Sequence, residues 1–574
     1  MKTPDVQLPR GFWVLALLLA GLMLATLGIR PLFNPDEGRY VDIPQEMLAS
    51  HDFIVPHLNG VVYLEKPPLQ YWLTALTLQV LGPTELGGRL ILGLAWLGIG
   101  WVVYRLSVRL YAPERAVYAV AMALSGLLIQ LMSTLLTLDL SLSFWLLLAV
   151  LSLCEAQWWR QRLSDPAQSG HTPAHGRVLS RRWMWACYAA MAGATLTKGL
   201  IGVVLPGLGL LLYTALQRDL KLWRHLHLVS GLSLYAALTV PWFWAVEHHH
   251  AGALQFLIIH EHFQRYLTTI HERYRPIWYF FALLLPALLP WCAQGLRALV
   301  SMGVSTGPKH ERDARFDAKR LLWAMSVVIL VFYSFSDSKL PPYILPMMPL
   351  LAVLAAGHPV STLSTDLRIS HGLVGLLGLA LVVFGIWQPL LNPGADQQLM
   401  VTRLAPWLLS FGVVLLVVVG VSHLALRRSQ WLTASLILSG GFLLTGIGLF
   451  HVGAASISYR YSAKELLSHA PPIDPTAPVY SVTTFDWTLP VYLKHTVIPV
   501  AWRGELDYGL TDQPKAARES LEIFQQEWQN LPQGYALIPR AVHNQLQQAG
   551  LPMSVQAYDF DNVWVSRRDT PPHE

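Results

Sequence analysis

The sequence predicts an all-α polytopic membrane domain followed by a small C-terminal α/β soluble domain. Of its 574 residues, 53% are apolar and only 13% are charged, whereas soluble domains average about 45–50% apolar and about 25% charged residues. Apolar runs long enough to cross a bilayer recur as far as residue 451, and the remaining tail is polar. This composition excludes a soluble enzyme, a disordered chain and a fibrous repeat.

The apolar runs predict about 13 transmembrane helices, because a bilayer core requires about 20 mostly apolar residues per helix. The first run follows Lys2 and Arg10 with no clear cleavage site, so we expect an uncleaved helix rather than a signal peptide. The runs cover residues 12–30, 89–111, 116–134, 138–157, 183–197, 199–216, 229–247, 277–296, 321–337, 340–357, 371–389, 404–425 and 431–451.

The charge distribution predicts the orientation of these helices. If the N-terminus lies on the inner side and successive helices cross the membrane in alternating directions, just over half of the 41 Lys and Arg residues fall in inner segments or at the helix ends that lead into them. The positive-inside rule describes this bias. The outer face then carries two long loops, 31–88 and 248–276, and the tail. We therefore expect a membrane domain at 1–451 and an outer domain at 452–574.

The tail alternates β-rich and helical stretches, which is typical of a small α/β domain. The β-rich runs lie at 479–482, 497–501, 536–539 and 563–566, with helical stretches at 516–528 and 541–549. The tail shows no motif that assigns it a role.

Several classes of site find no support in the sequence. Cys154, Cys187 and Cys292 all lie in apolar runs, which argues against a disulfide framework or a cysteine metal site. No P-loop, GxGxxG or HExxH motif is present, so we expect no nucleotide cofactor. We expect no nucleic-acid partner, because the net charge of +6 reflects the bias of the inner loops.

The first outer loop carries charges at the depth of the lipid headgroups, where a buried charge must be paired or functional. Asp36 and Glu37 follow the first helix, and Arg39, Glu65 and Lys66 come after them. A carboxylate at this place can orient a nucleophile, remove its proton or bind a metal. The plain alternative is a pair of solvated loop carboxylates, but the neighbouring charges favour a site. Amphipathic stretches at 41–49 and 69–79 are expected to lie in the interface.

Other charged residues fall at the outer ends of predicted helices. Asp139 opens the fourth helix, where it acts either as a helix-dipole partner or as a site residue. Lys198 and Lys339 either extend to the headgroups or join the site. The Pro-Pro-Tyr sequence after Lys339, which ends at Tyr343, is unusual for a plain anchor.

The second outer loop is rich in histidine and contains His262 and Arg265, which share one face of a helix at i,i+3 spacing. Glu261 with His262 offers ligands for a metal, although histidine-rich loops are more often ordinary. Together, the two loops and the helix ends place several cations on one face of the membrane. Convergent cations at headgroup depth suit a phosphate, which Arg holds bidentately and Lys as a point charge, and a lipid phosphate is the nearest source.

The run PDEGRYVDIPQEMLASHDFIVPHLNGVVYLEKPPLQYW at 35–72 resembles the first periplasmic loop of the bacterial 4-amino-4-deoxy-L-arabinose transferases, which modify lipid A. TKG at 197–199, EHFQRY at 261–266 and SKLPPYILP at 338–346 are similar to the same family. The similarity spans about residues 10–360, and the later helices and tail match mainly in layout. This family belongs to the polyprenyl-phosphate-dependent glycosyltransferases with the GT-C fold, related to the protein O-mannosyltransferases.

The resemblance implies a multi-pass protein of the Gram-negative inner membrane with a periplasmic active site and a periplasmic C-terminal domain. It implies transfer of 4-amino-4-deoxy-L-arabinose, a pentose, from undecaprenyl phosphate to a lipid A phosphate. This lipid A modification gives resistance to polymyxin and other cationic peptides. We expect the protein to be a monomer.

The resemblance also implies roles for individual residues. Asp36 and Asp139 correspond to acidic positions of the family, and Glu37 is included with them as a catalytic candidate. The family holds a divalent metal near the carrier phosphate, most often zinc, for which Glu65 and His262 are the corresponding ligands. The residues expected to bind the carrier phosphate are Arg39, Tyr63, Lys66, Lys198, Arg265, Lys339 and Tyr343.

Two alternatives stay open at this stage. A glycosyltransferase that uses another polyprenyl-phosphate sugar would act on a protein or glycan hydroxyl, and Asp36 would then serve as a true base. A lipid or solute transporter would belong to a different class. Transporters tend to show internal repeats and ionisable residues near the midplane, whereas here the charges collect at one face and no repeat is evident.

Overall fold

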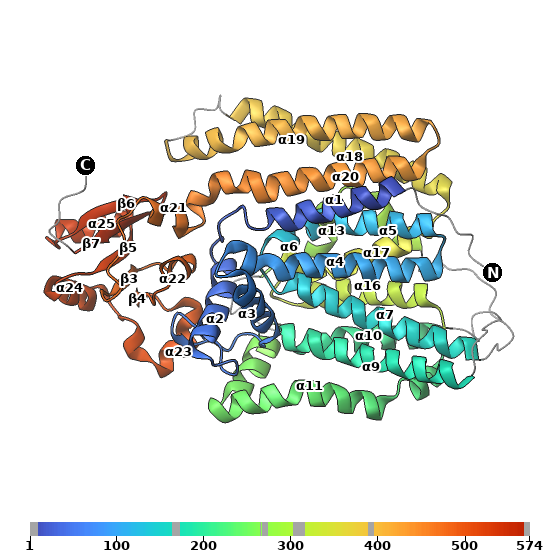
Figure 1. The fold of residues 1–574 in the computed structure, drawn as a ribbon, viewed down its shortest axis with the longest axis horizontal. Helices are drawn as coiled ribbons and strands as arrows, with labels where there is room; N and C mark the ends of the chain where they lie inside the picture. The colour runs from blue at the N-terminus through green and yellow to red at the C-terminus, as the bar shows by residue number, and fades with distance from the viewer. Residues whose placement is uncertain are drawn as a thin grey trace.

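The computed structural model describes residues 10–163, 173–264, 266, 274–301, 316–388 and 395–567. A stack of roughly parallel helices forms the elongated body, and the α/β domain caps one end of it (Figure 1). The first described helix, α1 (Arg10–Thr26), begins at the end of the body opposite the α/β domain.

Each apolar run predicted from the sequence is helical over most of its length. The third run is divided at Gly126 into two helices bent by 57°, and the eighth is divided between residues 288 and 292. The helices of the body are α1 (Arg10–Thr26), α4 (Glu85–Leu110), α5 (Pro113–Ser125), α6 (Leu127–Thr134), α7 (Asp139–Leu163), α9 (Pro173–Lys198), α10 (Ile201–Gln217), η1 (Leu220–His225), α11 (Leu228–His249), α13 (Tyr279–Leu288), α14 (Cys292–Ser301), α16 (Ala318–Phe335), α17 (Met347–Ala355), α18 (Val360–Trp387), α19 (Ala395–Arg427) and α20 (Trp431–Ile447).

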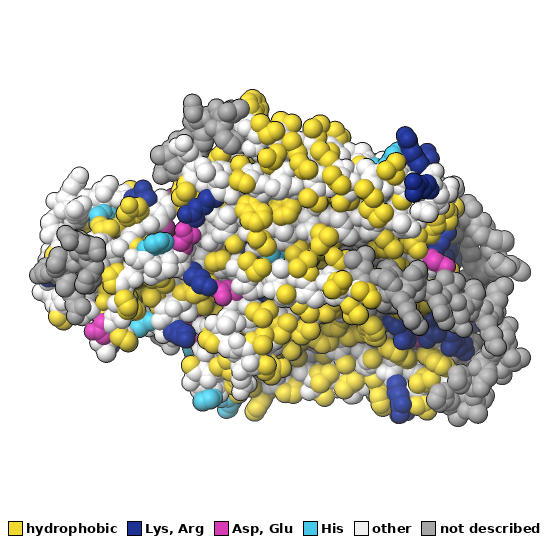
Figure 2. Space-filling view, turned by 45° about the horizontal axis from the view of Figure 1, so that its top comes forward, with side chains coloured by type: hydrophobic (Ala, Val, Ile, Leu, Met, Phe, Trp, Pro, Cys, Tyr) yellow, Lys and Arg dark blue, Asp and Glu magenta, His cyan; other side chains and the backbone are white. Residues whose placement is uncertain are grey.

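The body has the surface of a multi-pass membrane protein. Within the described residues, 7 helices are long and apolar enough to cross a membrane, or up to 8 if α5 and α6 count as one broken span. The other predicted runs form helices that are shorter, broken or, in α9, more charged. In α11, α18 and α19 only 22–28% of the residues of the most apolar stretch are buried inside the body, whereas in α7 83% are. Hydrophobic side chains cover the visible face of the body, and Lys and Arg gather near its ends (Figure 2).

The first outer loop is a compact layer between the body and the α/β domain (Figure 1). It contains α2 (Asp36–Ser50) and α3 (Leu69–Leu81), which match the predicted amphipathic stretches, and the hairpin β1 (His57–Leu58) and β2 (Val61–Val62). The hairpin turns at Asn59 and Gly60, both at positive φ, as an Asn-Gly turn favours. Two further segments complete this face, η2 (Gln255–Gln264) after α11 and η4 (Pro341–Ile344) before α17.

The C-terminal domain is built on a five-stranded mixed sheet with the strand order β4-β3-β5-β7-β6. Strand β3 is parallel to β4 and β5, and β7 is antiparallel to β5 and β6. The segments η6 (Gly448–Val452) and η7 (Gly453–Arg460) continue α20 toward this domain. The elements of the domain itself are α21 (Ala463–Ser468), β3 (Val479–Val482), α22 (Thr488–Leu493), β4 (Ile498–Val500), η8 (Gly504–Leu506), α23 (Asp507–Asp512), η9 (Pro514–Ala516), α24 (Leu521–Asn530), β5 (Tyr535–Pro539), α25 (Arg540–Gln548), β6 (Ser554–Tyr558) and β7 (Asn562–Ser566). The sequence did not predict β6, because this edge strand exposes Val555 and Tyr558 and lacks an apolar signature.

The C-terminal domain rests directly on the first outer loop. The side chain of Asn59 bonds the backbone of Val497 twice, with its Nδ2 donating to the carbonyl and its Oδ1 accepting from the N–H, each at 2.7 Å. Asn34 Oδ1 accepts from the N–H of Trp487 at 3.0 Å. A Cβ on Gly38 would lie 2.3 Å from the carbonyl oxygen of Trp487, so only glycine permits this approach. The domain is therefore fixed above α2.

Candidate active site

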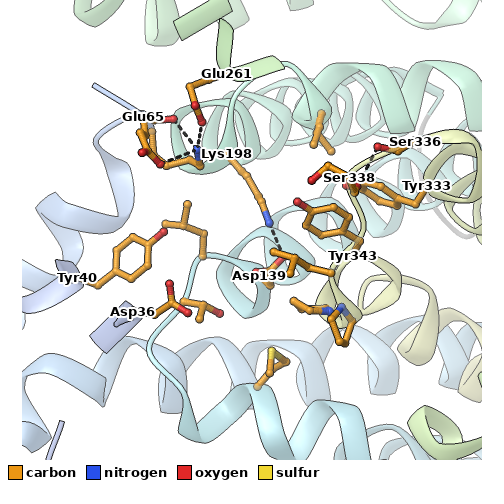
Figure 3. A pocket seen from close by; sticks show the side chains of 18 of the residues that line it. Asp36, Tyr40, Glu65, Asp139, Lys198, Glu261, Tyr333, Ser336, Ser338 and Tyr343 are labelled. Atoms are coloured by element: carbon orange, nitrogen blue, oxygen red, sulfur yellow. Dashed lines mark hydrogen bonds and ion pairs between the residues drawn. The ribbon is translucent and has the colours of Figure 1, made fainter. Parts of the chain in front are cut away.

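A cavity of about 730 Å³ lies where the first outer loop, the outer ends of the helices and the C-terminal domain meet. Its walls come from α2, the segment before α3, the start of α7, the α9–α10 junction, η2, the end of α16, η4 and η8. One part of the wall is apolar and includes Leu131, Met132, Ile201 and Val204. The charged side chains collect in the other part (Figure 3). A lipid with an ionic head matches a cavity divided in this way.

Lys66 contacts two carboxylates at one side of the cavity. Its Nζ lies 2.5 Å from Glu261 Oε2 and 3.9 Å from Glu65 Oε2, and it also donates to the carbonyl of Glu65 at 2.7 Å. Glu261 comes from η2, so this contact joins the two outer loops. The Glu261 side chain is only 1% exposed, and its pairing with Lys66 compensates the buried charge.

Lys198 and Asp139 form a second ion pair inside the cavity (Figure 3). Lys198 is the last residue of α9 and Asp139 is the first of α7, and Nζ lies 2.5 Å from Oδ1. The ammonium also lies 4.9 Å from the centre of the Tyr343 ring, which is within the range of a cation–π contact. The Lys198 side chain thus points into the cavity rather than toward the headgroups.

On a third side of the cavity, Arg39 is paired with two carboxylates. It forms ion pairs with Asp36, one turn earlier on α2, and with Glu505 of the C-terminal domain. Its guanidinium also lies over the ring of Trp487, 5.6 Å from the centre. The hydroxyl of Tyr63 is 3.5 Å from Nη1, at the limit of a hydrogen bond.

Two tyrosines of the cavity stay protonated. Burial raises the pKa of Tyr40 and of Tyr63 well above the ordinary value. Both hydroxyls are therefore donors at any physiological pH, which suits an anionic ligand. The Tyr40 ring is held by stacking on Tyr71, with 5.8 Å between the ring centres.

The structure does not place Glu37 in the cavity with Asp36. Glu37 is 1% exposed and lies between Arg30 and Arg89, with contacts of 2.8 Å and 2.7 Å. It also accepts the backbone N–H of Phe33 at 2.7 Å. Burial alone would raise the pKa of Glu37, but the two guanidinium groups hold it at about 2. This carboxylate ties α2 to α4 and to the segment that follows α1, rather than facing a ligand.

Lys339 also differs from its predicted placement. Its neighbours Ser338 and Leu340 line the cavity, but its own Nζ donates to the backbone carbonyls of Ser336 and Arg275. It therefore fixes the segment before η4 from behind the cavity wall. Arg265 and the side chain of His262, both predicted for the site, lie outside the described residues.

The residues that the structure describes do not assemble a metal site. Among them, no three His, Cys, Asp or Glu side chains come close enough together to hold a metal ion. Glu65, the predicted ligand, faces the ammonium of Lys66, which already supplies a positive charge to Glu65 and Glu261.

Comparison with known proteins identifies the family. The chain is 31% identical over 460 residues to the undecaprenyl phosphate-α-4-amino-4-deoxy-L-arabinose arabinosyl transferase of Edwardsiella ictaluri, covering 76% of each chain. The chain belongs to this family of arabinosyl transferases. It is therefore a glycosyltransferase, as the sequence predicts. The relative of the same name from Pectobacterium carotovorum is 27% identical and covers 87% of this chain and 86% of its own.

Family models and a solved structure agree with this result. The family described as aminoarabinose transferase C-terminal domain matches residues 467–567, and dolichyl-phosphate-mannose-protein mannosyltransferase matches residues 65–165. The crystal structure of ArnT from Cupriavidus metallidurans bound to undecaprenyl phosphate superposes with a TM-score of 0.87 at 28% identity. The alignment covers 99% of this chain and 100% of that one.

Glu505 is the one charged residue of the described lining that the sequence alone does not indicate. Glu505 lies in the tail within the run WRGELDYG, which carries no recognisable motif. Tyr40, an uncharged lining residue, is not indicated by the sequence either, although it follows Arg39 directly. Glu261 was considered only as a metal ligand, whereas the structure makes it the partner of Lys66.

Proposed function

We propose that this protein transfers 4-amino-4-deoxy-L-arabinose from undecaprenyl phosphate to a phosphate of lipid A at the periplasmic face of a Gram-negative inner membrane. One observation carries this proposal: Arg39, Lys66 and Lys198, with their carboxylate partners, converge on one part of a cavity whose other part is apolar. A polyprenyl phosphate matches both halves, because its phosphate suits the cations and its chain suits the wall. The names of the relatives and the ligand of the Cupriavidus metallidurans structure support this choice of donor.

The charges of the cavity suit the reaction. The bond between the anomeric carbon and the carrier phosphate breaks, and its electron pair stays on the phosphate. An oxygen of the acceptor phosphate forms the new bond to the same carbon. Arg39, Lys66 and Lys198 stabilise the charge that grows on the departing phosphate, and fixed charges of this kind are often the largest catalytic contribution. Tyr63 and Tyr343 are placed to donate hydrogen bonds to it.

The acceptor requires little deprotonation, because a phosphate monoester is already ionised near neutral pH. Asp36 therefore orients the acceptor or the sugar instead of acting as a strong base. Asp139 holds Lys198 in the cavity through their ion pair.

The finer features of the prediction belong to the same proposal. We propose that all 13 apolar runs cross the membrane, with α13 and α14 forming one of these spans together. We also propose that residues 1–451 form a transmembrane domain in the inner membrane and that residues 452–574 form a periplasmic domain. The protein is proposed to be a monomer. A divalent metal near Glu65 stays a prediction, for which His262 would be the second ligand.

A hydroxyl acceptor is the second candidate. The match of residues 65–165 to dolichyl-phosphate-mannose-protein mannosyltransferase favours it, because that family name describes transfer to protein. A hydroxyl must lose its proton during transfer, so Asp36 would then act as a general base. Transfer to a hydroxyl acceptor that Asp36→Asn abolishes would mark this case.

Purified protein in liposomes tests the proposal directly. Synthetic undecaprenyl phosphate-linked aminoarabinose and lipid A are supplied, and the product is identified by its mass. We expect the wild type to produce the lipid A adduct, and Asp36→Ala and Lys66→Ala to abolish it without loss of insertion. Glu519→Gln and Lys515→Ala remove exposed charges of the C-terminal domain and serve as controls. Normal transfer by either site variant would contradict the proposed roles.

A further inference from the structure

Two carboxylates of the cavity, Asp36 and Asp139, come from distant parts of the chain. Asp36 opens α2, and Asp139 opens α7 and pairs with Lys198. Asp139 follows the turn at 135–138 between α6 and α7, which also supplies part of the cavity lining. The spacing of these two parts of the site therefore depends on what joins α2 to this turn.

Glu37 joins α2 to the turn through the backbone. Its Oε1 accepts the N–H of Leu136 at 3.1 Å. Its buried partner Arg30 donates from Nη2 both to Glu37 Oε1, at 3.1 Å, and to the carbonyl of Thr134, at 2.9 Å. This ion pair thus bonds the start of the turn at two points. Both contacts are to the backbone, so they place the turn whatever side chains it carries.

The ion pair is itself fixed from α4. Arg89 donates from Nε to Glu37 Oε1 at 2.7 Å and from Nη1 to the carbonyls of Leu27 and Arg30 at 2.8 Å and 2.6 Å. The three charged side chains are 1–3% exposed. Rigid, water-free contacts of this kind hold neighbouring segments at a fixed distance.

Both carboxylate oxygens of Glu37 face N–H donors in the described contacts. Oε1 accepts from Arg30, Arg89 and Leu136, and Oε2 accepts from Arg89 and from the backbone of Phe33. A glutamine at this position would turn its own NH2 group toward donors in either orientation. Glu37→Gln therefore perturbs the turn while keeping nearly the same side-chain volume.

We propose that Glu37 is a positioning residue that sets the place of Asp139, and through it Lys198, relative to Asp36. This inference rests on the proposed function, in which Lys198 stabilises the charge that grows on the departing phosphate. A displacement of about 1 Å at a reacting site can lower the rate about 100-fold even when the altered residue lies away from the chemistry. Asp36 and Glu37 then serve one site from opposite sides of α2, the first inside the cavity and the second behind its wall.

The chain offers a matched control for the loss of a buried charge. Glu155 is 0% exposed and lies between Arg105 and Arg109, with contacts of 3.2 Å and 2.8 Å. It belongs to the same helix as Asp139, but about 24 Å farther along it at 1.5 Å per residue. Glu155→Gln therefore removes the counterion of two arginines without touching the turn at 135–138.

The test measures transfer of aminoarabinose to lipid A in liposomes, at a temperature below the unfolding midpoint of every variant. For Glu37→Gln we expect kcat to fall by about 10- to 100-fold and the KM for the donor to change by less than about threefold. Glu155→Gln should keep kcat within about twofold of the wild type, because it is remote from the site. Added to Asp139→Asn, Glu37→Gln should lower kcat by less than about a further threefold, since the group that it positions is already lost.

Two further measurements keep the inference testable if Glu37→Gln does not fold. Arg30→Lys keeps the positive charge but removes the planar fork that bonds Glu37 and Thr134 together, so it should lower kcat in the same direction. Hydrogen exchange needs no substrate. The backbone amides of the peptide 131–138 should exchange faster in Arg30→Lys and in folded Glu37→Gln than in the wild type, and unchanged in Glu155→Gln.

The outcomes separate this inference from the proposed function. Equal losses of kcat in Glu37→Gln and Glu155→Gln, or a full loss from Glu37→Gln on top of Asp139→Asn, would show that Glu37 only stabilises the fold. Unchanged exchange at 131–138 would show that Glu37 does not hold the turn. Each of these results overturns the inference alone. If the wild type transfers no sugar to lipid A, the proposed function fails, whereas the exchange measurement still decides whether Glu37 fixes the turn that carries Asp139.

Discussion

Replacing Glu37 by Gln should lower the stability of the protein, and it should not remove a catalytic group. The substitution keeps the shape of the side chain but leaves the guanidinium groups of Arg30 and Arg89 buried without a counterion. Breaking a buried ion pair from one side costs about 3–5 kcal/mol. The pKa of Glu37 gives a similar value, because a fall from 4.5 to about 2 corresponds to about 3 kcal/mol.

The pH dependence of this contribution has a definite sign. The pKa of Glu37 is lower in the folded than in the unfolded protein, so its contribution to stability is complete above about pH 4.5. It is lost as the pH falls toward 2. Unfolding of the purified protein in detergent, followed by heat or denaturant at pH 7 and pH 3, measures both effects. The wild type should lose stability between these pH values, and Glu37→Gln should already lack this contribution at pH 7.

A matched control is Glu465→Gln, which breaks the partly exposed ion pair with Arg403. It should cost less than about 1 kcal/mol. The reasoning about Glu37 would be refuted if Glu37→Gln kept the unfolding midpoint of the wild type yet lost transfer. That result would make Glu37 a site residue, as the sequence alone suggested.

Three further predictions follow from the described contacts. Asp139→Asn and Lys198→Met each break the same ion pair. The double variant should therefore lose less transfer activity than the sum of the losses, as free energies, in the two single variants. Additive losses in a steady-state assay would show that the two residues act independently. In Gly509→Val, the new side chain would collide with the carbonyl of Val62 and displace the neighbouring η8, which lines the cavity. The rate of transfer should fall at least tenfold, and wild-type kinetics would contradict this. Burial raises the pKa of Asp42 to about 7, so its carboxylate is charged and buried at pH 8 but protonated at pH 4. Asp42→Asn should therefore stabilise the protein at pH 8, by at most about 4 kcal/mol, and change its stability little at pH 4. The unfolding midpoints of the variant and the wild type at the two pH values test this difference.

The helices of the body were predictable because hydropathy is a local property of the chain. Every apolar run is helical over most of its length, but the breaks that divide the third and eighth runs were not predicted. The Asn-Gly turn at 59–60 is a local signal that predicts a hairpin when it is read with the flanking residues. Strand β6 was not predictable in this way, since its partner β7 rather than its own composition places it in the sheet.

The site was predictable only in part, because its contacts join distant segments. The sequence identified Lys66 and Asp139, but their partners Glu261 and Lys198 lie 195 and 59 residues away. Asp36 and Glu37 are neighbours in the sequence, yet successive residues of a helix point about 100° apart, so one faces the cavity and the other faces the buried arginines. Glu505 required the docking of the C-terminal domain, which no local pattern reveals.

The most direct test of the account is the mass spectrum of lipid A from a Gram-negative strain that lacks its own aminoarabinose transferase and expresses this protein. The Asp36→Ala form, expressed to the same level, is measured beside it. The account predicts that the wild type restores the aminoarabinose adduct on lipid A and that the variant does not. Unchanged lipid A in the presence of well-expressed wild-type protein would contradict the assignment of this donor and acceptor.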